Sequence, residues 1–224
     1  MSDNTQPTQP PEPKKSGLKI GISYNSPVIL SFAVICTGIL LLNYVIPSFT
    51  LRFFTVPSKD AGFRFLSLDF YKLFSHAMGH ANWGHLVGNF TFILLIGPIL
   101  EEKYGSLRLI LMMFVTALVT GILNVLFFPQ GLLGASGIVF MLILLISITN
   151  YSSGKIPLTF ILIVLLFLGQ EVYRAVFDTQ NNVSEFAHII GGICGGVFGF
   201  LLAGGKNKTG AATTPPAGTP GAGV

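Results

Sequence analysis

The sequence predicts an all-α membrane protein, a bundle of six transmembrane helices with a long, membrane-associated loop after the first helix. Three observations support this fold class. Of the 224 residues, 51% are hydrophobic and 10% are charged, whereas soluble domains carry about 25% charged residues. The mean hydropathy is +0.70. Six apolar runs approach the roughly 20 residues that a membrane-spanning helix needs, and polar segments separate them.

The first predicted span covers residues 27–46, which form one apolar run. Residues 47–84 follow as a long connection that carries many aromatic residues on a polar background: Phe53, Phe54, Phe63, Phe65, Phe70, Tyr71 and Phe74. Aromatic side chains are enriched at the headgroup layer of a bilayer. We therefore expect this loop to lie along the membrane surface.

Five further spans follow this loop in the sequence. Each is an apolar run that ends at charged residues, a tight turn or a polar loop, and their predicted ranges are 85–100, 107–128, 136–150, 156–169 and 186–203. The fifth has the shortest clearly apolar part, so lipid holds its outer half less firmly than the other spans. Residues 27–204 form the predicted membrane domain.

Both ends of the chain are predicted to be disordered tails. Residues 1–26 are polar and proline-rich, and residues 205–224 are a low-complexity Thr/Pro/Ala/Gly segment. Neither resembles a signal peptide, and with six spans both tails lie on one side. Eight Lys and Arg residues fall on the side of the tails and five on the other. The positive-inside rule therefore predicts cytoplasmic termini. The six-span layout and the lack of a targeting presequence favour a prokaryotic plasma membrane, with an organelle membrane as the alternative.

The net charge of +4 is scattered along the chain. No basic helix or aromatic stacking platform accompanies it, so a nucleic-acid partner is not expected. Cys36 and Cys194 both lie in apolar runs and are interpreted as packing residues. The sequence predicts neither a metal site nor a cofactor.

Three predicted spans carry polar residues at the same depth. Counted from the inner ends at 1.5 Å per residue, Ser136, His188, His85 and Asn89 lie roughly 18–24 Å up a core of roughly 30 Å. Polar groups inside a membrane are costly and usually face a protein interior or a water-filled cavity. The alternative is that they hydrogen-bond between helices and only hold the bundle together.

The residue types at this depth are suited to acyl transfer. A serine hydroxyl becomes nucleophilic when a base takes its proton, and His188 is the available base for Ser136. No carboxylate is expected at this level, so the prediction is a Ser-His dyad. His85 and Asn89, four residues apart on one helix face, can donate to a developing oxyanion together with the Ser136 amide.

Glycines at three- and four-residue spacing follow His188 along the sixth span: Gly191, Gly195 and Gly199. A strip without side chains lets another backbone approach closely, most simply the fourth span behind Gly137. Such strips are also common in membrane helices that only pack.

These motifs resemble the rhomboid family of intramembrane serine proteases over about residues 70–203. They are His80-x4-His85-x3-Asn89, Gly134-Ala135-Ser136-Gly137 and Ala187-His188-x2-Gly191-x3-Gly195, in this order. Residues 97–105, with Glu101, are also similar to the family's loop after the second span. The resemblance implies Ser136 as nucleophile, His188 as general base and acid, His85 and Asn89 as oxyanion stabilisers and His80 as a structural residue.

The implied activity is cleavage of the transmembrane segment of a protein substrate, near the outer face of the bilayer. Two positions depart from the family pattern. Tyr71-Lys72 stands where many members carry Trp-Arg, and Phe140 stands where some have a tyrosine against the catalytic histidine. Ring stacking can survive at Phe140, but the hydroxyl group is lost. The first alternative is a catalytically inactive relative that binds membrane proteins. The second is a small transporter, and it is disfavoured because the sequence shows no clear internal repeat and no carboxylate within the core.

Overall fold

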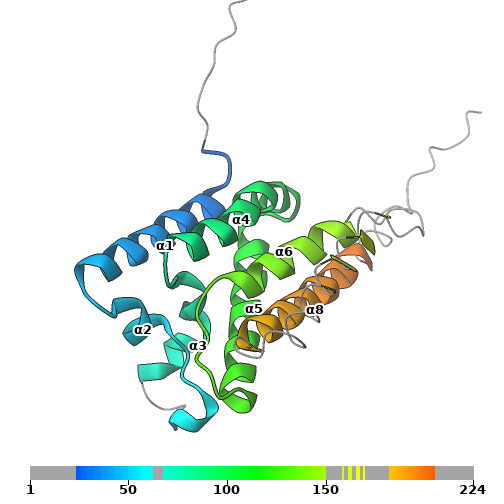
Figure 1. Cartoon of the computed structure of the whole chain (residues 1–224). Coiled ribbons are helices and arrows are strands. Elements are labelled where there is room, and N and C mark those ends of the chain that lie inside the picture. The colour runs from blue at the N-terminus through cyan, green and yellow to red at the C-terminus, as the bar shows by residue number, and fades with distance from the viewer. Residues whose placement is uncertain are drawn as a thin grey trace, which may run out of the picture.

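The computed structural model describes residues 24–62, 68–149 and 182–204, together with six isolated positions between 158 and 169 (Figure 1). In these ranges the regular secondary structure is helical, apart from a single antiparallel bridge between Val56 and Leu132. The predicted all-α class is therefore confirmed.

In the described part of the chain, three helices are long and apolar enough to cross a membrane: α1 (Pro27–Val45), α4 (Trp83–Tyr104) and α5 (Ser106–Phe127). Two further helices, α6 (Ser136–Thr149) and α8 (Asn182–Gly204), match the predicted fourth and sixth runs and contain shorter apolar stretches within the described residues. The predicted fifth span, 156–169, lies outside the described segments except for isolated positions.

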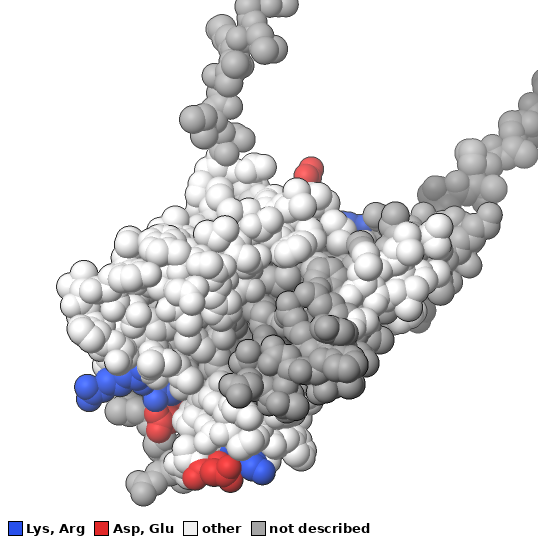
Figure 2. All heavy atoms as spheres, in the orientation of Figure 1, with Lys and Arg blue, Asp and Glu red and all other residues white. Residues whose placement is uncertain are grey.

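Charged side chains on the visible face lie at two opposite ends of the described part of the molecule, with a broad uncharged band between them (Figure 2). Large apolar side chains of α1, α4 and α5 are exposed, among them Val34, Leu95 and Leu111. Exposed hydrocarbon of this extent is unfavourable in water. The surface is that of an integral membrane protein.

Two predicted helix ends were wrong by about one turn. α4 continues past residue 100 to Tyr104, and α8 begins at Asn182 inside the segment predicted as a polar loop. Hydropathy shows where a chain meets lipid, whereas backbone hydrogen bonding decides where a helix ends. Glu and Lys are good helix formers, so α4 runs on to Gly105, whose φ of +82° suits glycine.

The long first loop contains short helices: α2 (Phe49–Phe54), η1 (Lys59–Ala61), η2 (Leu68–Tyr71), α3 (Lys72–Ser75) and η3 (His76–Met78). It packs on α5, where Gly121 contacts the backbone of the buried Leu73 and leaves no room for a Cβ atom. Phe53 and Phe70 are exposed. That this loop lies along a membrane surface stays a prediction.

One buried carboxylate joins the starts of α1 and α5 to the end of α4. Glu101 accepts hydrogen bonds from the amides of Val28 at 3.0 Å and Ile29 at 3.1 Å, and from the Ser106 hydroxyl at 2.7 Å. The amides at a helix N-terminus have no intrahelical partner and carry partial positive charge, so an anion stabilises them. The sequence placed Glu101 at this end of the bundle but did not predict this cap.

The helix α6 is the most enclosed part of the bundle and lies between α4 and α5 on one side and α8 on the other (Figure 1). Its side chains fill the core on several faces, and Ile138, Met141, Leu142 and Leu145 are at most 3% exposed. Against α8 the contact is backbone to backbone, because Gly191 faces Gly137. This close packing fixes the start of α6 relative to α8.

Candidate functional site

Ser136 is the first residue of α6 and is partly exposed. The helix starts here because the Ala135 carbonyl accepts the first intrahelical bond, from Val139 N at 3.0 Å. The preceding Gly134 has a φ of +119°, a conformation that L side chains rarely adopt. The sharp approach to α6 therefore places Ser136 at a helix N-terminus, where its own amide has no partner within the helix.

The α4 helix places His85 and Asn89 against the turn that precedes Ser136. A Cβ atom on Gly134 would lie 2.6 Å from Cε1 and from Nε2 of His85, and 3.8 Å from Nδ2 of Asn89. The start of α4 is fixed by Asn82, whose side chain accepts from the His85 amide at 2.8 Å. Only glycine at position 134 leaves room for the His85 ring, whereas Asn89 lies at an ordinary contact distance.

Asn89 is 7% exposed, and its Nδ2 group makes no hydrogen bond within the described part of the chain. Burying an amide donor without a partner costs about 1–3 kcal/mol. A fold that carries this cost has a donor ready for a group that binds at this position.

The α8 helix brings His188 to the same place. Its Gly191 contacts the backbone of Gly137, and a Cβ atom on Gly137 would lie 3.3 Å from the carbonyl oxygen of Ala187. The His188 ring stacks on Phe140, with 4.3 Å between ring centroids and 8° between planes. The stacking that the sequence allowed for at Phe140 is present.

His85 from α4 and His188 from α8 thus both approach the first turns of α6. The four polar residues predicted at one depth, Ser136, His188, His85 and Asn89, therefore come from three helices to the start of α6. Their roles are not decided by this placement alone.

His80 lies beside this group and is fully buried. Its ring centroid is 5.1 Å from that of His85, and its Nδ1 lies 3.4 Å from the Met78 carbonyl. Burial, and then the charge of His85, lower the pKa of His80 from 6.5 to about 4. His80 is thus neutral at pH 7 and packed behind the site, in keeping with a structural role.

Sequence reasoning missed His76. Its backbone carbonyl accepts the Gly134 amide at 3.0 Å, and its ring Nε2 lies 3.5 Å from Thr120 Oγ1 of α5. Burial lowers its pKa to about 4. His76 therefore connects the turn before Ser136 to α5. Its place in the series His76, His80 and His85 could have singled out the residue, but nothing in the sequence indicated its backbone contact with Gly134.

Lys72, at the position where many family members carry Arg, forms an ion pair with Asp69 at 2.8 Å. A lysine is a point charge and cannot make the planar two-point contact of a guanidinium group. The pair joins the η2 and α3 segments of the first loop, a local contact that the sequence did not predict.

Comparison with known proteins agrees with the sequence motifs. The family model for the rhomboid domain matches residues 67–205. RHOMBOID-like protein 4 of Arabidopsis thaliana is 32% identical over 155 residues, which are 66% of this chain and 36% of that protein. Rhomboid-related protein 2 of Mus musculus is 32% identical over 145 residues, 59% of this chain and 48% of the relative.

The rhomboid protease GlpG of Haemophilus influenzae is 23% identical over 134 residues, 58% of this chain and 69% of that protein. The matches to the two eukaryotic relatives thus span between about a third and a half of those proteins. The matched region contains α4, α5, α6 and α8 and all the site residues described above. The resemblance noted in the sequence is confirmed, and the chain belongs to the rhomboid family.

Proposed function

We propose that this protein is an intramembrane serine endopeptidase that cleaves transmembrane segments of membrane-protein substrates. The observation that carries this proposal is the convergence on the start of α6. Gly134 contacts His85 and Asn89, and Gly137 contacts the helix that bears His188. A serine, a histidine base and two donors are the groups that acyl transfer requires.

In the proposed reaction, His188 takes the proton of the Ser136 hydroxyl as its Oγ attacks the scissile carbonyl carbon. The resulting oxyanion is stabilised by Asn89 Nδ2, by the His85 side chain and by the Ser136 amide. His188 then gives its proton to the leaving amine, and an acyl-enzyme remains on Ser136. Water, deprotonated by His188, then attacks the acyl carbon. The bond from this carbon to Ser136 Oγ breaks, and His188 returns the proton to Oγ as the carboxylic acid product leaves.

The proposed dyad does not include a carboxylate that orients His188. Within the described residues the buried carboxylate is Glu101, which lies 16 residues along α4 from His85, or about 24 Å. The stack on Phe140 holds the imidazole plane in its place. We therefore propose that Phe140 positions His188 by ring packing.

The rest of the proposed arrangement follows from the charge and depth of the predicted spans. We expect six spans with both termini in the cytoplasm of a cell, and Ser136 roughly 6–12 Å below the outer edge of the hydrocarbon core of its membrane. Substrates enter between the second and fifth spans and must unwind locally, because a helix hides its scissile bonds. Small residues near the cut are the expected preference.

Labelling with a fluorophosphonate tests the proposed nucleophile directly. We expect the purified protein in detergent to be labelled at Ser136, and Ser136→Ala to remove the label. His188→Ala is expected to reduce the labelling rate strongly, because the hydroxyl loses its base. The matched control is Ser147→Ala on the same helix, whose hydroxyl donates to the Ile143 carbonyl. Equal labelling of parent and Ser136→Ala would contradict the proposal.

Replacing Asn89 with leucine is expected to separate catalysis from stability. Removing one oxyanion donor lowers kcat by roughly 10²–10³-fold, while KM changes little. The thermal midpoint should not fall, because a buried donor without a partner is removed. Thr91→Ala, on an exposed part of α4, is the control. An unchanged kcat would exclude Asn89 from the oxyanion site.

A further inference from the structure

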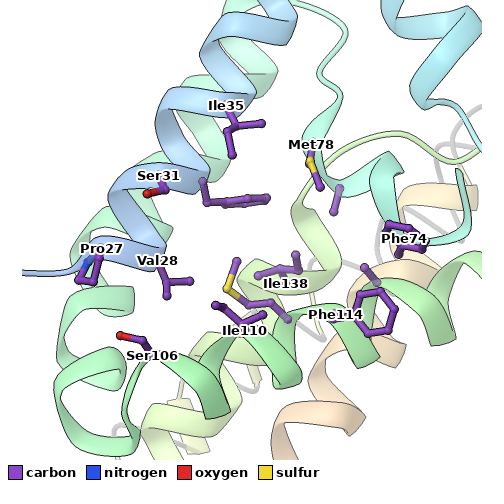
Figure 3. A pocket seen from close by; sticks show the side chains of 14 residues that line it. Pro27, Val28, Ser31, Ile35, Phe74, Met78, Ser106, Ile110, Phe114 and Ile138 are labelled. Carbon is purple, nitrogen blue, oxygen red and sulfur yellow. The ribbon is translucent and has the colours of Figure 1, made fainter. Parts of the chain in front are cut away.

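A hollow of about 500 Å³ lies between α1, α5 and the η3 segment (Figure 3), and none of the site residues lines it. Val28 and Ile35 line it from α1, Ile110 and Phe114 from α5, Met78 from η3 and Ile138 from α6. Figure 3 shows these side chains directed into one common space. Interiors are normally close-packed, so a space of this size is a candidate site for a bound molecule.

The hollow is a wedge between two diverging helices. α1 and α5 start at one corner, where Glu101 binds the first turn of α1 and the Ser106 hydroxyl, and they separate from there (Figures 1 and 3). Lining residues extend over positions 27–35 of α1 and 106–117 of α5, which is about 12 Å and 16 Å of helix. The first loop closes the wide end.

The chemistry of the lining excludes ordered water and polar ligands. Apart from two serines at the narrow end, the side chains are apolar. The Ser106 hydroxyl already donates to Glu101 at 2.7 Å, and Ser31 Oγ is 3.0 Å from the Tyr24 hydroxyl. A buried water needs two to four polar partners, which this space does not offer.

The hollow opens sideways onto the lipid-facing surface. Ile35 and Ile110 are each 48% exposed and Phe114 is 42% exposed, so the mouth lies among exposed apolar side chains. The surface beside it continues through Val34 and Leu111, which do not line the hollow. Both walls are candidate membrane spans, so the medium at the mouth is hydrocarbon.

We propose that the hollow binds an acyl chain of a phospholipid from the surrounding bilayer. The bound acyl chain packs against the side chains of Met78 and Ile138. Met78 belongs to the η3 segment that begins at His76, whose carbonyl holds the Gly134 amide, and Ile138 is two residues after Ser136. An acyl chain at this place therefore supports both segments that position Ser136. The binding does not depend on the proposed proteolytic function; only its effect on catalysis does.

Photo-crosslinking tests the binding. The full-length protein is reconstituted in nanodiscs of phosphatidylcholine that carries a diazirine in one acyl chain, irradiated and mapped by mass spectrometry. We expect cross-links to concentrate on the facing residues of 27–35 and 106–117. Uniform labelling of all exposed apolar faces, including Leu94 and Leu95 of α4, would overturn the proposal.

A matched pair of variants makes the test specific. Ile110→Trp places an indole ring in the hollow and narrows it, so cross-links to its lining are expected to fall, while those on α4 persist. Leu111→Trp, one residue further and outside the lining, should leave them unchanged. If Ile110→Trp does not fold, Ile35→Trp with Val34→Trp as its control gives the same comparison from the α1 wall. Equal cross-linking of the lining in Ile110→Trp or Ile35→Trp and in its control variant would refute the proposed acyl-chain site.

An activity measurement separates this inference from the proposed function. With a cleavable substrate, Ile110→Trp and Ile35→Trp are expected to lose activity on lipid removal less than the parent does, because less of their activity depends on a bound acyl chain. The parent protein could cleave no substrate while Ile110→Trp still loses the cross-links that the parent forms. In that case the proposed function fails and the acyl-chain site stands.

Discussion

Replacing Ser136 with alanine is expected to reduce cleavage of a single-span substrate to the uncatalysed background. The substitution removes the attacking oxygen and leaves no other nucleophile at the start of α6. His188→Ala keeps the hydroxyl but removes its base, so kcat should fall by roughly 10²–10⁴-fold. Because both groups act in one step, the double variant should be no slower than Ser136→Ala alone.

The comparison is made in proteoliposomes with one substrate and equal amounts of folded protein, judged by thermal unfolding. Ser147→Ala is again the control, since its hydroxyl lies on α6 away from the convergence of Gly134 and Gly137. Cleavage at the parental rate in both single variants would remove the dyad. A parent that binds several substrates and cleaves none would instead favour an inactive, membrane-protein-binding relative.

The existence of the helices could be predicted from apolar runs, because lipid imposes a simple requirement on chain length and composition. The third run, predicted at 107–128, corresponds to α5 at Ser106–Phe127. The approach of α6 to α8 was also visible, since glycines at three- and four-residue spacing allow helix backbones to meet. Both signals are local and periodic.

Contacts between distant segments left no such signal. Glu101 is 72 and 73 residues from the two amides that it caps, and nothing in its own neighbourhood indicates that it is buried. His76 likewise acts through its backbone carbonyl on Gly134, an interaction that residue type does not encode. Both depend on how the first loop and the helix ends are brought together by the fold.

The candidate site was predicted as a set of residues at one depth, and the structure adds how they meet. Depth counting could not show that the His188 ring lies on Phe140, or that Gly134 is the contact for His85 and Asn89. These contacts depend on helix rotation and tilt, which packing decides rather than hydropathy.

Two adjacent glycines on α8 give the sharpest test of that packing. A methyl group at Gly191 would overlap the backbone of Gly137, whereas one at Gly192 would only meet Leu144 at 3.6 Å and 3.7 Å. Alanine is favoured over glycine in a helix by about 1 kcal/mol, so Gly192→Ala should be neutral or stabilising. Gly191→Ala is expected to lose about 1–3 kcal/mol of unfolding free energy despite this gain, because two backbones must separate.

The separation would also move His188 away from Ser136, so cleavage should fall in Gly191→Ala and persist in Gly192→Ala. Thermal unfolding and substrate cleavage of the two purified variants measure both effects, and equal behaviour would mean that α6 and α8 do not meet at Gly137.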